Sequence, residues 1–405
     1  MRRTLLGCLL LGVFSQTTLA ASPRIVGGDD LTQAPGWMVS IQQSQAPSWL
    51  NSHFCGGTLI APEWVMTAAH CVESTQLSQL NLILGTALIN NQTEGVKVDQ
   101  VIVHPDWLPS WELGNSSGDR SFAEFAGDIA LLHLTSAQTA TPVTRATAAQ
   151  QAALGSYDAI SAIGWGATDS AATQYPYQLQ SVVLPYLGDI ESSLPSHIFA
   201  GGEEQKNICF GDSGGPLFLD NTQYGIDSFL TSYSSTLTCG DYGAESGFTS
   251  VAYYSNWIDQ QLEGLSYTNQ QGLDVTVGTT GTAHFVIRNK DTVAWQITDL
   301  VSTDSTLTEN CQATALQPGS SCSVDVSYTA TTVGASQQID ITFNANSGSE
   351  TRSGQMMLRA TSQAQMPDDT VSSSGGGSLG HLALAGLGLL ALGRRQRPSR
   401  HTNNR

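Results

Sequence analysis

The stretch Gly211-Asp212-Ser213-Gly214-Gly215-Pro216 is a glycine-rich turn with a serine inside it. Two earlier stretches, Thr67-Ala68-Ala69-His70-Cys71 and Gly127-Asp128-Ile129-Ala130-Leu131-Leu132, supply a histidine and an aspartate in that order. Each stretch alone is weak evidence, because a histidine beside a cysteine is more often structural than catalytic. Together with Arg24-Ile25-Val26-Gly27-Gly28 upstream, they indicate a catalytic combination rather than three structural motifs.

These four stretches resemble the chymotrypsin/trypsin family of serine proteases over residues 25–264. The resemblance implies an all-β fold with two six-stranded β-barrels and an active site in the cleft between them. The residues themselves show short apolar segments between Gly, Pro, Asn and Ser turns, such as Trp37–Ile41 and Ile129–Leu134, which is typical of all-β proteins. Residues Val251–Leu262 have helical spacing and predict a helix.

The resemblance also assigns chemical roles. His70 would act as general base and then general acid, since a serine hydroxyl is a weak nucleophile until its proton is removed. Asp128 would orient the imidazole, and Ser213 would attack the peptide carbonyl. The backbone N–H groups of Gly211 and Ser213 would form the oxyanion hole. This chemistry needs no metal and no cofactor.

The residues around Arg24 predict a zymogen. In the family, the acid before the nucleophile pairs with a newly cut N-terminus, here Asp212 with the α-ammonium of Ile25. Cleavage after Arg24 would release a propeptide of residues 22–24. The activating protease would be another enzyme or the protein itself.

Residues 1–21 have the features of a signal peptide: Arg2 and Arg3, an apolar run, and small residues at the end. Six cysteines remain besides Cys8, and an even number in an exported chain favours disulfides over metal ligation. Six cysteines can pair in many ways, and the family resemblance narrows them. The expected pairs are Cys55 with Cys71, Cys209 with Cys239, and Cys311 with Cys322.

The substrate pocket departs from the trypsin pattern. Asn207 stands six residues before the nucleophile, where trypsin-like members have Asp. Asp241 and Glu245 are candidates to replace that acid, and Ser232-Tyr233-Ser234 is expected to form the opposite wall. The sequence leaves open whether the pocket accepts Arg and Lys, which is weakly favoured, or aromatic and large apolar side chains.

Residues 272–361 change character, with many Thr, Ser and Val residues and alternating apolar positions, for example Ile339–Phe343. This pattern predicts a β-sandwich of immunoglobulin size. The segment from Asn310 to Val324 resembles a bacterial immunoglobulin-like domain of a kind also found in cilium-associated proteins. The domain would serve either as a stabilising spacer or as a substrate- or surface-binding module.

The C-terminus consists of a Ser/Gly linker, 363–378, and an apolar segment with a basic tail, 379–405. This arrangement is similar to the Gly-Gly C-terminal sorting signal of Gram-negative surface proteins. The similarity implies type II secretion and removal of the tail by a rhomboid-type intramembrane protease. The protein would then be secreted or held on the extracellular cell surface; a permanent membrane anchor is the alternative.

The chain is acidic, with 16 Lys and Arg against 34 Asp and Glu and a net charge of −18 at pH 7. Such a protein repels nucleic acid, so nucleic-acid partners are excluded. The sequence therefore predicts a secreted serine endopeptidase whose partners are protein or peptide substrates, the activating protease, the export machinery and the sorting protease. Two alternatives are a catalytically inactive homologue that binds proteins, and an adhesin in which the β-sandwich is the functional part.

Overall fold

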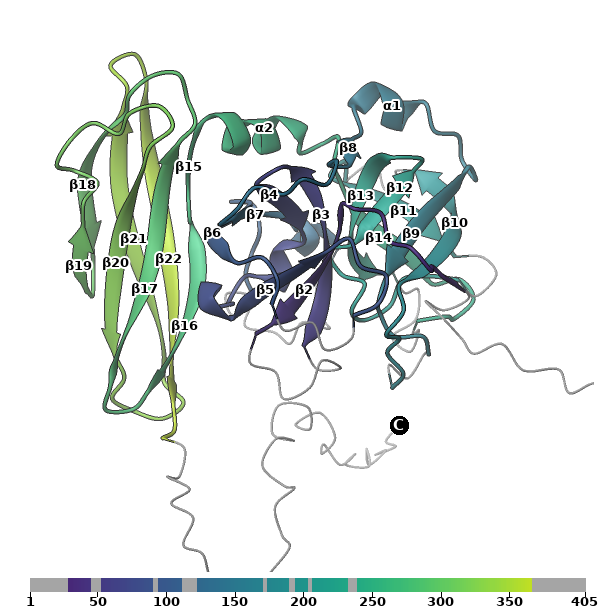
Figure 1. Cartoon of the computed structure of the whole chain (residues 1–405), viewed down its shortest axis with the longest axis horizontal. Helices are drawn as coiled ribbons and strands as arrows, with labels where there is room; N and C mark the ends of the chain where they lie inside the picture. The colour runs from purple at the N-terminus through teal and green to yellow at the C-terminus, as the bar shows by residue number, and fades with distance from the viewer. Residues whose placement is uncertain are drawn as a thin grey trace, which may run out of the picture. The chain divides into compact units, whose positions relative to one another are not determined.

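The computed structural model describes residues 28–44, 52–89, 94–110, 122–169, 173–188, 194–202, 206–231 and 239–365. The chain divides after Ala364 into two units, and the first of them contains nearly all the described residues. Its elements are β-strands with two α-helices and short 3₁₀ turns (Figure 1). The predicted signal peptide, propeptide and C-terminal tail lie outside the described residues.

The first six-stranded sheet has the order β5-β2-β3-β4-β7-β6 and forms a half-barrel. Its strands are β2 (Met38–Gln43), β3 (His53–Ala61), β4 (Trp64–Thr67), β5 (Leu80–Leu84), β6 (Val98–Val103) and β7 (Ala130–Leu134). A bridge between Leu82 and Val96 brings its two ends together. All the side chains of β4 and β7 are buried, so these strands are mostly apolar along their length and do not alternate with exposed residues.

The second sheet closes into a six-stranded barrel of order β10-β11-β14-β13-β12-β9, because β9 also pairs with β10. Its strands are β9 (Ala159–Gly164), β10 (Gln180–Gly188), β11 (His197–Gly201), β12 (Pro216–Leu219), β13 (Thr222–Leu230) and β14 (Glu245–Ser250). The short strands β1 (Asp29–Asp30) and β8 (Thr144–Arg145) extend the same sheet. The helix α1 (Ala148–Ala152) lies between β8 and β9 in the chain and begins with a capping box at Thr147.

The helix predicted from Val251 begins later than expected. The structure places α2 at Ser255–Glu263, since β14 continues to Ser250 and the residues between them form turns. The Ser250 hydroxyl accepts a hydrogen bond from the N–H of Tyr253, which gives the chain a turn before the helix. Helical spacing therefore identified the element but not its first residue.

Two four-stranded sheets, β15-β17-β20-β19 and β16-β22-β21-β18, make up the C-terminal sandwich (Figure 1). Its strands are β15 (Leu265–Tyr267), β16 (Gln270–Thr276), β17 (Thr280–Asn289), β18 (Gln296–Ser302), β19 (Thr306–Glu309), β20 (Ser321–Thr329), β21 (Ser336–Asn346) and β22 (Thr351–Gln363). Apolar side chains alternate inward along these strands and pack around Trp295 and Phe285. The predicted all-β fold, a trypsin-like double barrel followed by an immunoglobulin-like sandwich, is confirmed.

Strand β16 and Asn269, the residue before it, contact the half-barrel directly. The amide of Asn269 bonds both the N–H and the carbonyl of Val103, at 2.8 and 2.6 Å. Gln270 donates from Nε2 to the carbonyl of Glu73 at 2.6 Å. A Cβ at Gly272 would lie 1.9 Å from the carbonyl oxygen of Ser74, so this close approach requires glycine. The segment that follows His70 is thus packed against β16.

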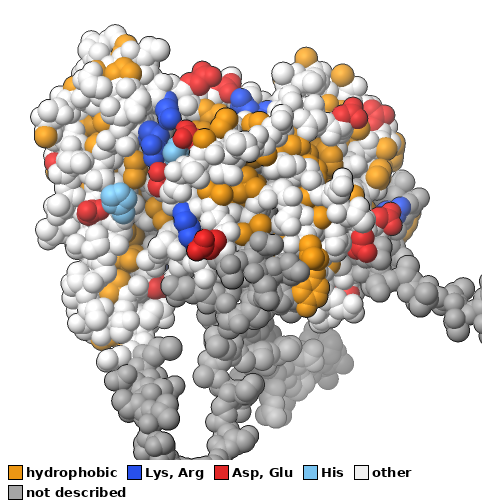
Figure 2. Space-filling model, viewed as in Figure 1, with side chains coloured by type: hydrophobic (Ala, Val, Ile, Leu, Met, Phe, Trp, Pro, Cys, Tyr) orange, Lys and Arg blue, Asp and Glu red, His pale blue; other side chains and the backbone are white. Residues whose placement is uncertain are grey.

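Charged side chains lie in small mixed groups on the face shown in Figure 2, separated by neutral surface. That face carries no broad basic surface of the kind that binds a phosphate backbone. Among the described residues, no helix combines the length and apolar character needed to cross a membrane.

Candidate active site

His70 and Asp128 meet in the half-barrel. His70 lies in a 3₁₀ turn, Ala69–Cys71, just after β4, and Asp128 lies just before β7. The imidazole Nδ1 donates to Oδ2 of Asp128 at 2.8 Å, and the backbone N–H of His70 donates to Oδ1 at 2.9 Å. Because the Nδ1 proton is held by the carboxylate, Nε2 is the ring nitrogen left to accept a proton.

Two hydroxyls from the second barrel also hold Asp128. Ser228 of β13 donates to its Oδ2 at 2.5 Å, and Thr249 of β14 donates to its backbone carbonyl at 2.9 Å. Burial alone would raise the pKa of Asp128, which is fully buried, but His70 and the hydrogen bond from Ser228 hold that pKa below its ordinary value. Asp128 is therefore an anion that both barrels fix in place. Neither Ser228 nor Thr249 belongs to a motif that the sequence analysis used.

Ser213 lies half-buried in the turn that precedes β12. Its carbonyl accepts a hydrogen bond of 2.7 Å from the N–H of Gly56 in β3, next to the disulfide between Cys55 and Cys71. Gly214 has a φ of +78°, and a Cβ there would lie 2.2 Å from Oγ1 of Thr67. The glycine pattern thus lets the serine turn lie directly against the strands that carry His70.

The backbone N–H groups of Gly211 and Ser213 donate to no group among the described residues. His53, which the sequence analysis did not single out, holds this loop from the other side. Its Nε2 donates to the carbonyl of Gly211 at 3.0 Å, and its Nδ1 is 2.8 Å from the hydroxyl of Ser40. Burial lowers the pKa of His53 to about 4, so the ring is neutral and donates only from Nε2.

Asp212 is buried beneath the serine turn. Its two carboxylate oxygens accept hydrogen bonds from the N–H groups of Gly166, at 2.8 Å, and Cys209, at 2.9 Å. Burial raises the pKa of Asp212 to about 7, although these two hydrogen bonds act in the opposite direction. Arg24 and Ile25, its predicted partners in activation, lie outside the described residues.

Asn207 at the predicted pocket floor is fully buried and bound to the segment after Cys239. Its Oδ1 accepts from the N–H of Gly240 at 2.8 Å, and its Nδ2 donates to the carbonyl of Ala244 at 3.4 Å. Asp241 and Glu245 lie on this segment and are half-exposed, whereas Ser232, Tyr233 and Ser234 fall outside the described residues. The structure therefore brings Asn207 close to the segment with the two candidate acids.

The three expected disulfides form in the structure, Cys55–Cys71, Cys209–Cys239 and Cys311–Cys322. Among the described residues, one group of ligand-type side chains lies close together: Cys55, His70 and Cys71. Because its two cysteines are bonded to each other, they offer no thiolate to a metal ion.

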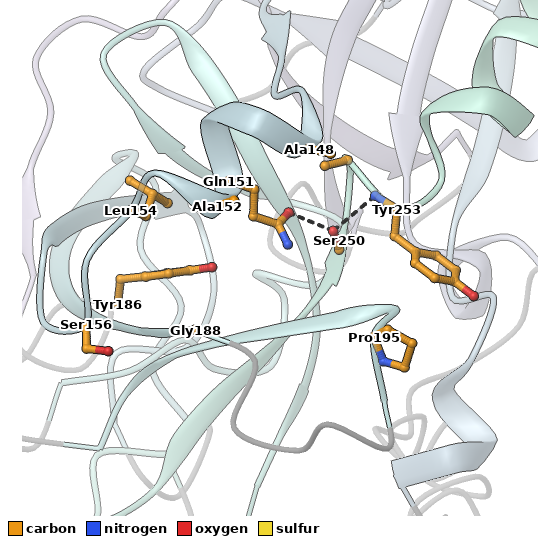
Figure 3. A pocket seen from close by; sticks show the side chains of 11 residues that line it. Ala148, Gln151, Ala152, Leu154, Ser156, Tyr186, Gly188, Pro195, Ser250 and Tyr253 are labelled. Carbon is orange, nitrogen blue, oxygen red and sulfur yellow. Dashed lines mark hydrogen bonds between the residues drawn. The ribbon is translucent and has the colours of Figure 1, made fainter.

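A separate cavity of about 390 Å³ lies in the second barrel, beside α1 (Figure 3). Gln151 accepts from the hydroxyl of Ser250 at 2.8 Å inside it, and Tyr186, Pro195 and Tyr253 form part of its wall. None of the residues predicted for catalysis or substrate binding lines it.

Comparison with known proteins agrees with this geometry. The trypsin family model matches residues 25–258. The chain belongs to the trypsin family. Chymotrypsin-like elastase family member 1 from Bos taurus is 32% identical over 269 residues, covering 63% of this chain and 95% of that protein. The human protein of that name is 31% identical over 267 residues, covering 63% and 98%. This member of the trypsin family is a serine endopeptidase.

The second domain also has relatives. A model described as the HYDIN/CFA65/VesB-like, Ig-like domain matches residues 267–358. The Vibrio cholerae VesB protease aligns over 81% of this chain and 96% of its own, with a TM-score of 0.54 and 21% identity. VesC, a secreted serine protease from Vibrio cholerae, aligns over 85% and 73%, with a TM-score of 0.56 and 21% identity. At that identity these two structures establish the shared fold.

Proposed function

We propose that this trypsin-family endopeptidase is made as a secreted zymogen, is activated by cleavage after Arg24, and hydrolyses extracellular proteins through His70, Asp128 and Ser213. One arrangement carries the proposal. Asp128 holds the Nδ1 proton of His70. The carbonyl of Ser213 accepts a hydrogen bond from Gly56 in β3, and the neighbouring Cys55 is joined by a disulfide to Cys71, the residue after His70. These contacts support a single site that contains His70, Asp128 and Ser213.

In this mechanism the Oγ of Ser213 forms a bond to the carbonyl carbon of the substrate while Nε2 of His70 takes its proton. The negative oxygen of the tetrahedral intermediate accepts hydrogen bonds from the N–H groups of Gly211 and Ser213, which no described residue occupies. Each such donor typically lowers the barrier by about 3 kcal/mol. The carbon–nitrogen bond then breaks as His70 gives the proton to the leaving amine, and water repeats the sequence on the acyl-enzyme.

Activation would act on Asp212. Before cleavage it has no ammonium beside it, and a buried, unpaired carboxylate disfavours the arrangement seen around the serine turn. The new α-ammonium of Ile25 would neutralise the carboxylate and hold the N–H groups of Gly211 and Ser213 in the orientation that binds the substrate carbonyl oxygen. The secretion of VesC, which has the same fold, supports export of this chain, as does its N-terminal sequence. The C-terminal segment, 379–405, would direct surface sorting and be removed by a rhomboid-type protease.

A fluorophosphonate probe tests the proposal, since it labels only a serine activated by its histidine. The purified full chain should be labelled after trypsin treatment, with a new N-terminus at Ile25, and hardly before it. Arg24→Gln should stay unlabelled under the same treatment. Strong labelling of uncleaved Arg24→Gln would show that the activation step is wrong, whereas no labelling of the cleaved wild type would show that the triad is inactive.

A further inference from the structure

The turn that contains Ser213 is linked to β13 and to the segment that leads into β14. The serine turn is joined to β13 by hydrogen bonds of 2.8 Å from the N–H of Gly214 to the carbonyl of Asp227, and from the N–H of Asp227 to the carbonyl of Gly215. The disulfide Cys209–Cys239 joins the segment before the turn to the segment that leads into β14. Asp227 is therefore fixed by its backbone next to the nucleophile.

Strand pairing shows which way Asp227 points. Its neighbour Ile226 pairs with Thr249, whose hydroxyl binds Asp128, so that face of the sheet looks toward the half-barrel. Side chains alternate along a strand, which turns Asp227 to the opposite face together with its partner Phe248. Phe248 and Ile208 belong to the same hydrophobic core in the second barrel.

The floor of the predicted pocket lies on that same face. Ser246 is two residues before Phe248 on β14 and therefore shares its face, and its hydroxyl accepts a hydrogen bond of 3.3 Å from the N–H of Ile208. Ile208 follows Asn207 directly. Asp227 thus faces the segment that carries Asn207, whereas Glu245, adjacent to Ser246 on the strand, points to the other side.

The carboxyl group of Asp227 lacks a partner within the described part of the chain. The residue is 3% exposed, and no described group donates a hydrogen bond to its Oδ2. Burial, together with the charges of two nearby carboxylates, Asp212 and Asp128, raises the pKa of Asp227 well above the ordinary value. Burying such a group costs free energy that only a proton or an incoming cation can offset.

Asn207 cannot itself bind the cationic side chain of a substrate through a charge. It carries no charge, and both ends of its amide bind Gly240 and Ala244. Asp241 and Glu245 are half-exposed, so water and salt screen their charges. A carboxylate in a low-dielectric pocket attracts a guanidinium or ammonium group much more strongly.

We propose that Asp227 binds the basic side chain of the substrate residue whose carbonyl Ser213 attacks, so that this peptidase cleaves after Arg and Lys despite Asn207. The inference rests on the proposed role of Ser213. The buried acid of β13 takes the place of an acid at the pocket floor, and the bound substrate cation offsets the cost of ionising Asp227 in a buried site near other acids.

The test compares Asp227→Asn with the wild type as activated full-length chains, on peptides that differ only in Arg, Lys, Phe or Ala before the cleaved bond. We expect kcat/KM for Arg and Lys to fall by about 100-fold or more, and for Phe and Ala to change by less than about threefold. Fluorophosphonate titration supplies the concentration of active sites. Asp220→Asn is the matched control, because Asp220 is exposed in the turn between β12 and β13 with a φ of 54°, which Asn also adopts.

A pH series gives a second readout. The Arg/Phe ratio of kcat/KM in the wild type should rise with pH, since ionised Asp227 binds the cation, and should be flat in Asp227→Asn. If the variant does not fold, inhibition of the wild type by benzamidine and by its neutral analogue benzamide replaces this comparison, with the cation expected to bind about 100-fold more tightly.

Three results would overturn the proposal: an unchanged Arg/Phe ratio in Asp227→Asn, a fall of that ratio in Glu245→Gln or Asp241→Asn instead, or equal inhibition by benzamidine and benzamide. In each of these cases the enzyme still turns over Phe or Ala peptides or takes the fluorophosphonate label. Loss of both in the cleaved wild type would contradict the proposed function rather than the role of Asp227.

Discussion

Asp212 permits a quantitative test of the activation step, because its carboxyl group is buried while its predicted ammonium partner exists only after cleavage. In the uncleaved precursor, made as Arg24→Gln, replacement of Asp212 by Asn removes a charge that the native state cannot easily hold. We therefore expect Asp212→Asn to be more favourable for the stability of the precursor at pH 8 than at pH 4.

The pKa of Asp212 sets the size of this effect. Its value is raised from 3.8 to about 7. Below pH 3.8 both states are protonated and the group contributes nothing; between the two values the unfolded chain ionises first, so stability falls as the pH rises. Above pH 7 the loss is constant. Three pKa units correspond to a difference on the order of 4 kcal/mol in the free energy of unfolding.

The measurement is equilibrium urea unfolding of Arg24→Gln with and without Asp212→Asn, at pH 4 and pH 8. Asn also disturbs the hydrogen bonds from Gly166 and Cys209, but it does so at both pH values, so this contribution largely cancels in the difference. If activation proceeds as proposed, the cleaved enzyme should lack the effect, since the α-ammonium of Ile25 would neutralise Asp212. Equal changes at both pH values in the precursor would refute the reasoning.

Three further predictions concern other parts of the chain. Ser213→Ala should abolish peptide hydrolysis and fluorophosphonate labelling while the circular dichroism spectrum and Tm stay near wild type, because only a hydroxyl is removed; residual wild-type turnover would contradict the triad. Truncation after Gly377 should leave kcat/KM unchanged in the secreted protein and alter only surface retention in cell fractions; an inactive truncated protein would speak against the sorting role. Gly272→Ala should lower Tm by several degrees, because its Cβ would meet the carbonyl oxygen of Ser74 at 1.9 Å; an unchanged Tm would show that this contact is not rigid.

The sequence was most informative where chemistry requires particular residues in a particular order. His70, Asp128 and Ser213 lie far apart in the chain, and the structure brings His70 to Asp128 and the serine turn to Gly56. The three cysteine pairs also followed from order and resemblance. Glycine at 214 was informative because its backbone conformation and close contacts exclude a side chain.

The supporting residues left no such signal. Ser228 and Thr249 are ordinary polar residues in β-strands, and their contact with Asp128 depends on how the second barrel meets the first. His53 lies beside Gly211 through a contact across 158 residues of sequence. Asp227 stands out only once its burial and the absence of a partner among the described residues are known. The positions of all four side chains depend on packing between segments that are distant in the chain. Such packing cannot be predicted from the pattern of a single sequence.

The contacts of Gln270 and Gly272 with the segment after His70, and of Asn269 with Val103, also limit how the two domains can be exchanged between proteins. Because Gln270 and Gly272 pack against the main chain of Glu73 and Ser74, the sandwich cannot be exchanged without changing contacts of the peptidase domain. A chimaera that joins this peptidase to a foreign sandwich would need matching residues on both sides of the junction. Likewise, a genetic screen for loss of proteolysis should recover substitutions at Gln270 and Gly272 as well as at Ser213, although both the glutamine and the glycine lie outside residues 25–258, which match the trypsin family.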